Sequence, residues 1–449
     1  LHVVGEPVSP RRVVVVGGGI TGLAAAWFVR QSPDPPDVVV LESSGEVGGK
    51  LRTGDLGGHA VEAGAESMLA RRPEAVDLTT SVGLADALVS PATSAARVLV
   101  DGTLHDFPSG TVLGVPGDLR SLRASGVLTR RGLARVSAER ALPQPVRTGD
   151  IAVGRYVTQR LGREVTQRLV EPLLGGVYAG RSDELSLEAT IPALAQARRS
   201  GERLTTAAAR LRAGGAGTAD GSAPFVGLDG GLAQLSQRLA ATTGVQVRSR
   251  TTARALERGQ DGTWQVVTGP VPRPEMVPAD AVVLAVPATP AARLLREHAG
   301  VAAGLLDTID YASVGIIALG FRTTDVPTGA LRGSGHLVPP REGRAVKAAT
   351  YSTNKWDWVR RSADGLTIVR MSVGRYGDEA DLRRDDADLV RLASEDAADV
   401  LGMRTSPVAG AVFRWGGSLP QYRPGHVARV ERVRDSLRGE PRLALAGAA

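Results

Sequence analysis

The segment RRVVVVGGGITGLAAAWFVRQ, residues 11–31, constrains the fold more than any other part of the chain. Its apolar run at 11–16 is too continuous for a half-exposed strand and is typical of a parallel sheet covered on both faces. In the G-x-G-x-x-G spacing that follows, the first glycine allows a tight turn, the second a close approach to a pyrophosphate, and the third helix-on-strand packing. The next helix would point its first amides at the phosphates. The predicted dinucleotide-binding residues of this segment are Gly17, Gly19, Ile20, Thr21 and Gly22.

A second strand is predicted over DVVVLESS, residues 37–44, and it leads to Glu42 and Ser43. Glu42 lies about 20 positions beyond Gly22, where an acidic side chain accepts the ribose hydroxyls of a dinucleotide. Two strands, the helix between them and this acid together predict a Rossmann-type α/β domain that binds a nucleotide through these residues. A purely structural glycine turn is the alternative.

The next segment, GEVGGKLRT at 45–53, favours FAD over NAD. It carries a second glycine pair and leads to GHAVEAGAESML at 58–69, a strand, a small-residue turn and a helix, whereas an NAD fold would continue with another β-α unit. This arrangement resembles the large FAD oxidase family of amine oxidases, phytoene desaturases and protoporphyrinogen oxidases. The resemblance implies that Gly49, Lys50 and Leu51 line the dinucleotide. It implies that Gly64, Ala65, Glu66 and Ser67 approach the flavin.

Composition limits the chemistry that the side chains can supply. The 449 residues include no cysteine, which excludes disulfides, thiolate metal sites and a cysteinyl-linked flavin, so we expect non-covalent FAD and no metal. No apolar stretch approaches the roughly 20 residues that cross a bilayer. The first ten residues lack a signal pattern, and a cytoplasmic location is predicted.

The net charge of +7 is carried almost entirely by arginine, since only Lys50, Lys347 and Lys355 are lysines. No basic stripe is interleaved with aromatic residues, so nucleic-acid binding is not predicted. A diffuse basic surface would suit an anionic substrate or an anionic membrane face.

The predicted FAD-binding domain is discontinuous. It comprises residues 1–89, 222–297 and 411–449, because a strand centred on Val247 and the segments at 279–295 and 441–447 also read as strands or strand–helix units of the parallel sheet. A helix-rich insertion is predicted at 90–221, and an antiparallel-sheet substrate domain at 298–410. Low-complexity stretches at 212–224 and 268–280 are interpreted as a linker and a surface loop.

Within the helical insertion, apolar residues recur at helical spacing from 152 to 174, which predicts packing rather than a ligand site. The glycine pair Gly175–Gly176 is predicted to break this helix and to admit a flat ligand close to the backbone.

Four blocks, PLLGGVYAG, ARVLVDGTLHDFPSG, GRAVKAATYSTNKWDW and RWGGSLPQYRPGH, together resemble the oxygen-dependent porphyrinogen oxidases of haem synthesis. They are most similar to the Gram-positive, actinobacterial-type branch, which oxidises coproporphyrinogen III to coproporphyrin III. The resemblance covers nearly the whole chain. It implies hydride transfer from methylene bridges to FAD in three two-electron steps, with oxygen as acceptor and peroxide as product.

The resemblance also assigns roles to individual residues. Arg97 matches a propionate-binding arginine, Trp356 an aromatic that packs on the tetrapyrrole, and Gly175 a backbone position near a bridge carbon. Val247 would meet the adenine and Trp415 the isoalloxazine. Arg71 and Arg72 follow the flavin-approaching turn and could bind propionates. Lys347 and Lys355 share one block of an arginine-rich chain, where a compact ammonium is wanted. No catalytic side chain is predicted.

Several alternatives stay open at this stage. They are a protoporphyrinogen IX oxidase, a flavin amine oxidase, a carotenoid-type desaturase and a non-catalytic FAD-fold protein. The helical insertion could contact a membrane peripherally, and a downstream haem-pathway enzyme could be a partner. Relatives continue past the last predicted strand, so we expect a further turn and helix of about 15–25 residues, ordered by FAD.

Overall fold

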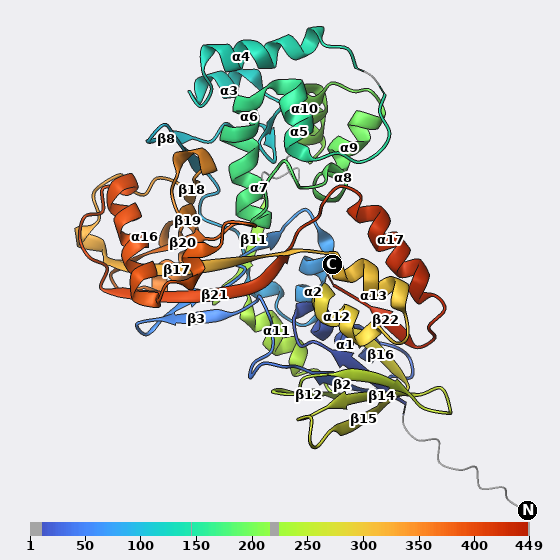
Figure 1. The fold of residues 1–449 in the computed structure, drawn as a ribbon. Coiled ribbons are helices and arrows are strands. Elements are labelled where there is room, and N and C mark those ends of the chain that lie inside the picture. Colours follow the sequence, from blue (N-terminus) through green and yellow to red (C-terminus); the bar gives the residue numbers. More distant parts are fainter. Residues whose placement is uncertain (1–10, 145, 216–223, 448–449) are drawn as a thin grey trace, which may run out of the picture.

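The structure is a computed structural model, which describes residues 11–144, 146–215 and 224–447. Figure 1 shows three parts: a parallel-sheet domain at lower right, an antiparallel sheet with helix α16 at left, and a group of helices at the top. The predicted fold class, an α/β dinucleotide-binding domain with a sheet-based part and a helical insertion, is confirmed. The turn and helix expected after the last strand lie outside the described residues, as does most of the predicted linker at 212–224.

A five-stranded parallel sheet forms the centre of the dinucleotide domain, in the order β12-β2-β1-β16-β22. Its strands are β1 (Arg12–Val16), β2 (Asp37–Leu41), β12 (Val245–Arg248), β16 (Ala281–Leu284) and β22 (Leu443–Leu445). The strand predicted near the end of the chain is confirmed, because Leu443 is in parallel register with Val282. Segments far apart in sequence therefore build one sheet.

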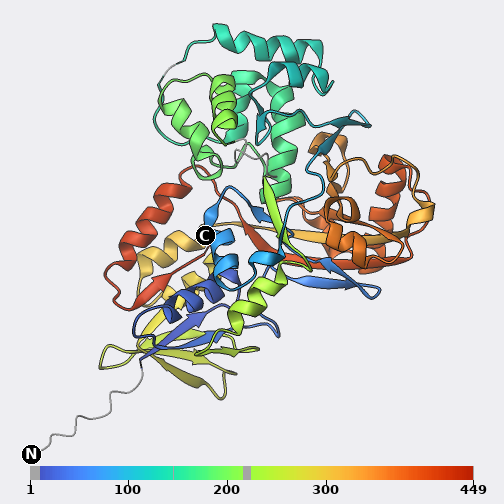
Figure 2. The ribbon, with the colours of Figure 1, turned by 180° about the vertical axis from the view of Figure 1, so that it is seen from behind.

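Both faces of this sheet are covered, as the apolar run of β1 predicts. Val13 and Val15 pack on one side and Val14 and Val16 on the other, because successive side chains of a strand point to opposite faces. The first side is covered by α1 (Ile20–Arg30) and α11 (Ala233–Ala240), which Figure 2 shows in front of the sheet. The second is covered by α12 (Ala288–Leu295), α13 (Gly300–Asp307), α17 (His426–Leu437) and a three-stranded sheet, β13 (Ala255–Arg258), β14 (Trp264–Thr268) and β15 (Glu275–Ala279).

Strand β15 corrects one sequence interpretation, since it lies within the predicted surface loop at 268–280. The prolines of this segment suggested a loop, but β15 is an edge strand and pairs only with β14, so Pro278 removes no ladder hydrogen bond that the sheet needs. Val277 of β15 is buried in the same core cluster as Trp264.

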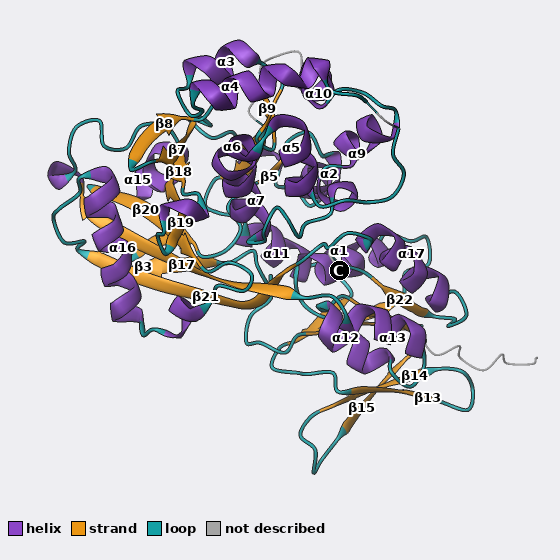
Figure 3. Cartoon of the chain, turned by 45° about the horizontal axis from the view of Figure 1, so that its top comes forward, coloured by secondary structure: helices purple, strands orange, loops and turns teal. Residues whose placement is uncertain are grey.

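The second large sheet has seven strands in the order β21-β17-β20-β19-β18-β7-β8. They are β7 (Ala96–Val100), β8 (Thr103–Asp106), β17 (Tyr311–Arg322), β18 (Gly335–Leu337), β19 (Val346–Tyr351), β20 (Leu366–Val373) and β21 (Ala409–Pro420). Figure 3 shows α16 (Asp386–Leu401) lying along it. The sheet takes β7 and β8 from the range predicted as helical insertion and β21 mainly from the range predicted as FAD domain, so the sequence ranges do not coincide with its edges.

The helices at the top of Figure 1 form their own core. They are α3 (Leu119–Ala124), α4 (Arg130–Ser137), α5 (Val153–Leu161), α6 (Arg163–Val165), the π-helical turn η3 (Thr166–Val170), α7 (Glu171–Tyr178), α8 (Leu187–Thr190), α9 (Pro192–Arg199) and α10 (Leu204–Gly215). The predicted apolar stripe is buried, from Val153 to Val170. The predicted helix break at Gly175–Gly176 is wrong: α7 runs through both glycines and ends at Tyr178, and the C-cap residue Ala179 has a left-handed φ of 49°.

Smaller elements complete the described chain. The short strands are β3 (Thr53–Leu56), β4 (His59–Glu62), β5 (Met68–Leu69), β6 (Leu88–Val89), β9 (Thr111–Val112), β10 (Val115–Pro116) and β11 (Phe225–Leu228). The short helices are α2 (Pro73–Ser81), α14 (Ser352–Lys355) and α15 (Asp357–Ser362). Among the residues that the structure describes, no helix has the length and apolar character needed to span a membrane.

Candidate active site

The glycines at the end of β1 form a cradle whose open side faces away from the protein. A Cβ at Gly17 would lie 2.6 Å from the carbonyl oxygen of Ala285, and one at Gly22 would lie 1.9 Å from that of Gly17. A Cβ at Gly19 would meet nothing within 4 Å. The protein itself therefore requires Gly17 and Gly22 to be glycine, whereas the space beside Gly19 fits a pyrophosphate.

Helix α1 begins beside this space at Ile20, and no side chain caps it. The first-turn amides of Ile20, Thr21 and Gly22 thus have no intrahelical partner, and the positive end of the helix is available to an anion. The cradle and the uncapped helix together fit the diphosphate of a dinucleotide cofactor.

Glu42 lies just beyond β2 at the same edge of the sheet. Its carboxylate accepts hydrogen bonds from the amides of Gly18 (2.8 Å) and Ser44 (2.7 Å), which fix its position beside the glycine turn. Ser43 is exposed next to it, and Val247 of the neighbouring β12 is half-buried. These placements suit the predicted ribose and adenine contacts, which stay predictions.

A continuous series of backbone hydrogen bonds joins the glycine turn to the predicted flavin-approaching turn. Gly48 donates to the carbonyl of Gly18 (2.8 Å), Leu51 donates to Gly48 (3.1 Å), and Ala65 donates to Lys50 (3.0 Å). A Cβ at Gly64 would lie 2.1 Å from the Lys50 oxygen, so only glycine allows this contact. The predicted cofactor segments are therefore one connected backbone structure.

Glu66, at the end of that structure, forms ion pairs with Lys355 and with Arg370. Lys355 comes from α14 and Arg370 from β20, and Arg370 also donates to the carbonyl of Gly64 (2.8 Å). All three charged side chains are at most 14% exposed. Burial opposes the charge of Glu66, but the two cations outweigh it and hold its pKa below the ordinary value. We call Glu66, Lys355 and Arg370 the ion cluster.

Arg370 was missed in the sequence, although it is the one charged residue inside the apolar strand LTIVRMSV. Such a residue must find a partner when the strand is buried, which is the signal that could have identified it. Glu62, also missed, lies near the cluster; burial raises its pKa to about 7, and one of its carboxylate oxygens has no partner among the described residues.

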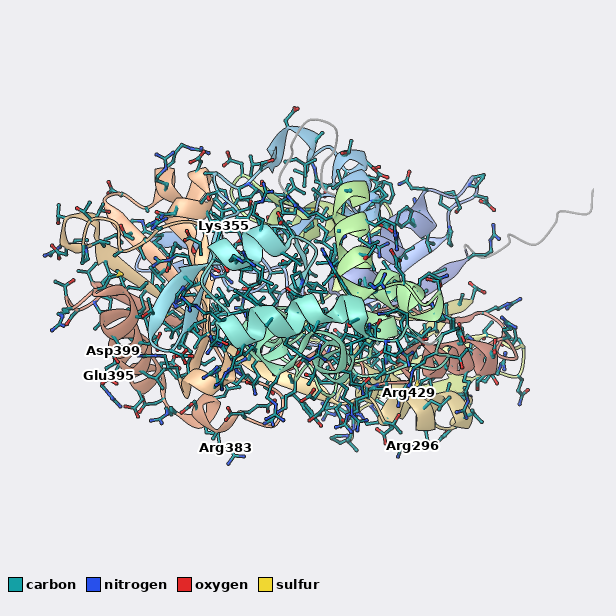
Figure 4. The ribbon with its side chains drawn as sticks, turned by 90° about the horizontal axis from the view of Figure 1, so that it is seen from above. Arg296, Lys355, Arg383, Glu395, Asp399 and Arg429 are labelled. Atoms are coloured by element: carbon teal, nitrogen blue, oxygen red, sulfur yellow. The ribbon has the colours of Figure 1, made fainter. Side chains whose placement is uncertain are left out.

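The two predicted aromatic contacts differ in exposure. Trp415 is half-buried, and its indole N–H donates to the carbonyl of Ala63 (2.8 Å), directly beside the Gly64 turn. Trp356 is 1% exposed and packs in a core with Leu56 and Ile368. The ammonium of Lys355 lies over its ring, so in this structure the ring has no free face on which a ligand could pack. In the view of Figure 4, Lys355 lies within the outline of the molecule, whereas Arg296 and Arg383 lie at its edge.

Arg97 is not brought to the ion cluster. It is in register with His336 of β18, which is in register with Ala349 of β19, so its side chain shares the face of the sheet covered by α16. Arg370 lies on the opposite face, because it alternates along β20 with core residues of the α16 side. Arg97 and Arg370 therefore lie on opposite faces of this sheet, and the propionate contact of Arg97 stays a prediction.

The other predicted substrate residues are also dispersed. Lys347 is buried, and its ammonium donates to the carbonyl of Gly374 (2.7 Å) rather than to a shared site with Lys355. Arg71 and Arg72 are exposed beside the turn that follows β5. Gly175 is buried in α7, and a Cβ there would lie 2.7 Å from a guanidinium nitrogen of Arg375.

The fold and the cofactor cradle define a flavoprotein of a known class. The family model described as flavin containing amine oxidoreductase matches residues 20–449, and the chain belongs to this family. It is 36% identical to the coproporphyrinogen III oxidase of Mycobacterium tuberculosis, over 98% of this chain and 93% of that protein. It is 31% identical to the coproporphyrinogen III oxidase of Bacillus subtilis (95% and 91% covered) and 30% identical to the protoporphyrinogen oxidase of Bos taurus (98% and 94%).

Comparison with solved structures agrees with this family assignment. A crystal structure from Exiguobacterium sp. 255-15 has a TM-score of 0.84 at 31% identity and covers 98% of this chain and 94% of that one. Cyclohexylamine oxidase from Brevibacterium oxydans, with a TM-score of 0.67 at 16% identity and coverage of 98% and 93%, shares the fold alone. The chain is thus a flavin-dependent oxidoreductase, and its predicted similarity to the porphyrinogen oxidases is confirmed.

Proposed function

We propose that this protein oxidises coproporphyrinogen III to coproporphyrin III with non-covalently bound FAD and molecular oxygen. The observation that carries the proposal is the ion cluster, because its two cations exceed its one carboxylate beside the turn that is hydrogen-bonded to the dinucleotide cradle, and burial keeps the nearby Glu62 partly protonated at neutral pH. Such a charge in a poorly solvated place favours an anionic substrate. The relatives named coproporphyrinogen III oxidase support the same substrate.

In this proposal the chain itself supplies binding and orientation. The amides of Ile20 and Thr21 and the space beside Gly19 would hold the diphosphate, and Glu42 would hold a ribose. Bound FAD would supply hydride acceptance from the methylene bridges of the substrate. Lys355 would attract a substrate carboxylate, while Arg370 fixes the turn through Gly64 and Glu66.

Protoporphyrinogen IX is the second candidate substrate, favoured by the 30% identity to the bovine protoporphyrinogen oxidase. It carries two carboxylates where coproporphyrinogen carries four, so a cationic site binds it less strongly. An amine substrate of a flavin amine oxidase is mostly protonated in neutral solution, and the positive charge of the ion cluster repels that form. The predicted cytoplasmic location, peripheral membrane contact and downstream partner enzyme stay predictions from the sequence.

The deciding experiment is anaerobic reduction of the bound flavin by coproporphyrinogen III, protoporphyrinogen IX and benzylamine, measured side by side by absorbance. We expect coproporphyrinogen to reduce the flavin fastest and, once oxygen is admitted, to yield porphyrin fluorescence and hydrogen peroxide. Faster reduction by protoporphyrinogen would reassign the substrate. Reduction by benzylamine alone would overturn the class of substrate.

A further inference from the structure

The positive charge of this protein is concentrated in one part of the helical domain. Residues 119–163 contain ten arginines and two acidic side chains, which gives this segment a formal charge of +8 against +7 for the whole chain. The remainder of the chain is therefore close to neutral. One of the two acids, Glu139, is fully buried and is engaged by the backbone at Leu204 and Thr205, so it neutralises little at the surface.

A polar cavity of about 460 Å³ opens within this basic region. Its walls are the last two turns of α5 and the start of the helix that follows it, α6 with η3. The lining residues are Arg155, Thr158, Gln159, Arg163, Thr166, Gln167 and Asp183. No apolar side chain lines the cavity, so an apolar ligand is disfavoured and a polar, charged one is favoured.

Each of the two walls carries one arginine and one glutamine whose side chains can donate hydrogen bonds to a ligand. Arg155 and Gln159 are one turn apart on α5, and Arg163 and Gln167 are one turn apart on the following helix. Neither guanidinium has a hydrogen bond or ion pair with any other residue that the structure describes. On the floor, the hydroxyls of Thr158 and Thr166 are hydrogen-bonded to each other at 2.8 Å.

The angle between the walls is held by specific contacts. The helix α5 ends at Gly162, whose φ of 95° turns the chain sharply into α6. Arg135 of α4 donates to the carbonyls of Gln159 (2.7 Å) and Arg160 (2.8 Å), the orphan acceptors at the end of α5. The backbone of both walls is thus fixed before any ligand arrives, so only the exposed side chains have to be ordered on binding.

Asp183 marks the rim of the cavity. The backbone beside it is fixed, since Gly154 donates to the carbonyl of Ser182 at 2.8 Å. A carboxylate in this position accepts hydrogen bonds from hydroxyl groups and repels a second anion. This open cavity therefore offers two exposed guanidiniums to an anion and an acceptor at its edge to a hydroxyl.

We propose that this cavity binds the phosphate ester of a small polyol, with the phosphate between Arg155 and Arg163 and a hydroxyl of the polyol at Asp183. Two guanidiniums and two amides on facing walls match the several oxygens of a phosphate better than the two of a carboxylate. A volume of about 460 Å³ accommodates an attached group as well. A free sugar or glycerol phosphate and a phospholipid headgroup share this chemistry.

Titration calorimetry of the FAD-loaded protein with glycerol 3-phosphate tests the site. We expect saturable binding that Arg155→Gln and Arg163→Gln each weaken by roughly ten-fold, because each removes a charge-assisted hydrogen bond. Arg131→Gln is the matched control: Arg131 is exposed on the neighbouring α4, has no described partner, and its loss changes the net charge equally. Asp183→Asn should tighten the binding of inorganic phosphate.

Co-sedimentation with phosphatidylglycerol vesicles then separates the two sources. If the protein binds the vesicles, and Arg131→Gln keeps this binding whereas Arg155→Gln and Arg163→Gln lose it, the ligand is a lipid headgroup. If the protein binds glycerol 3-phosphate but not the vesicles, the ligand is a free ester. Absence of saturable binding to glycerol 3-phosphate, or equal weakening in all three arginine variants, would overturn the proposal. None of these readouts depends on the substrate of the flavin site.

Discussion

Glu66 belongs to the dinucleotide domain, but both of its partners belong to the antiparallel-sheet part of the molecule. The residue therefore fixes the turn at Gly64 and the two cations, Lys355 and Arg370, relative to each other. Removal of its charge would leave Lys355 and Arg370 buried beside one another without a counterion, which is costly in a poorly solvated site.

We predict that Glu66→Gln lowers the free energy of unfolding by about 3 kcal/mol, because an uncompensated pair of buried cations remains. Urea titration of the FAD-loaded protein measures this. Glu46→Gln is the control, since its ion pair with Arg52 is mostly exposed and its loss should cost less than about 1 kcal/mol. Equal effects of the two substitutions would contradict the structural role of Glu66.

Lys347 gives a prediction about pH. Burial, reinforced by the nearby guanidinium of Arg375, lowers its pKa to about 7 in the folded protein, whereas an unfolded lysine titrates near 10.4. Between these values the unfolded chain binds more protons than the folded one, so stability rises with pH.

From pH 7 to pH 9 the wild type should gain about 2 kcal/mol in free energy of unfolding relative to Lys347→Met, at 1.36 kcal/mol per pH unit for one proton. Denaturant midpoints of both proteins across this range measure the difference. Parallel pH profiles would show that Lys347 is charged in the folded protein at neutral pH.

At the scale of elements, the unit β1–α1–β2 contains two glycines that can be compared directly. A Cβ at Gly22 collides with the carbonyl of Gly17, so α1 must move away from β1; a Cβ at Gly19 meets only the space assigned to the cofactor. Gly22→Ala should destabilise the apoprotein by about 3 kcal/mol.

Gly19→Ala should leave the apoprotein within about 1 kcal/mol of wild type, since alanine is only a poorer N-cap residue, yet it should weaken FAD binding. Melting temperatures without FAD, and FAD titration followed by flavin fluorescence, separate the two effects. Undiminished FAD affinity in Gly19→Ala would show that the diphosphate lies elsewhere.

Elements fixed by local patterns were predictable from the sequence, and long-range pairings were not. The continuous valine run of β1 and the stripe from Val153 to Val170 predicted the right elements, because burial on both faces of a strand selects an unbroken apolar run and burial of one helix face selects residues at helical spacing. The strand β15 and the uninterrupted α7 were missed, because sheet edges tolerate proline and tertiary packing overrides a glycine pair.

The candidate site shows the same division. The cradle follows from one short motif, so Gly17, Gly19 and Gly22 could be assigned in advance. The ion cluster depends on the pairing of β20 with β19 and on the packing of α14, and no spacing along the chain encodes those contacts. The propionate contact of Arg97 stays a prediction, and the face of the sheet on which this side chain lies is set by the register with β18, which no spacing along the chain encodes.

At the scale of the whole molecule, the arginine-rich helical segment and the ion cluster should both attract a polyanionic substrate. We predict that kcat/KM for coproporphyrinogen III exceeds that for protoporphyrinogen IX at low ionic strength, and that added salt narrows the ratio, because the Debye length shortens from about 30 Å at 0.01 M to about 8 Å at 0.15 M. Initial rates of porphyrin fluorescence at several salt concentrations test this. A ratio that is independent of salt would assign the preference to shape rather than charge.

Strand β16 pairs with β1 on one side and with β22 on the other, so residues from both ends of the described chain must meet before the parallel sheet is complete. At about 5–20 residues per second, a ribosome needs roughly 8–32 s to make the chain between β16 and β22. Throughout that time the outer edge of β16 has no partner strand and invites pairing with other chains. Synthesis that stalls before Leu443 would thus release an aggregation-prone product, and chaperone capture during translation is expected to matter more for this protein than for one whose sheet closes early.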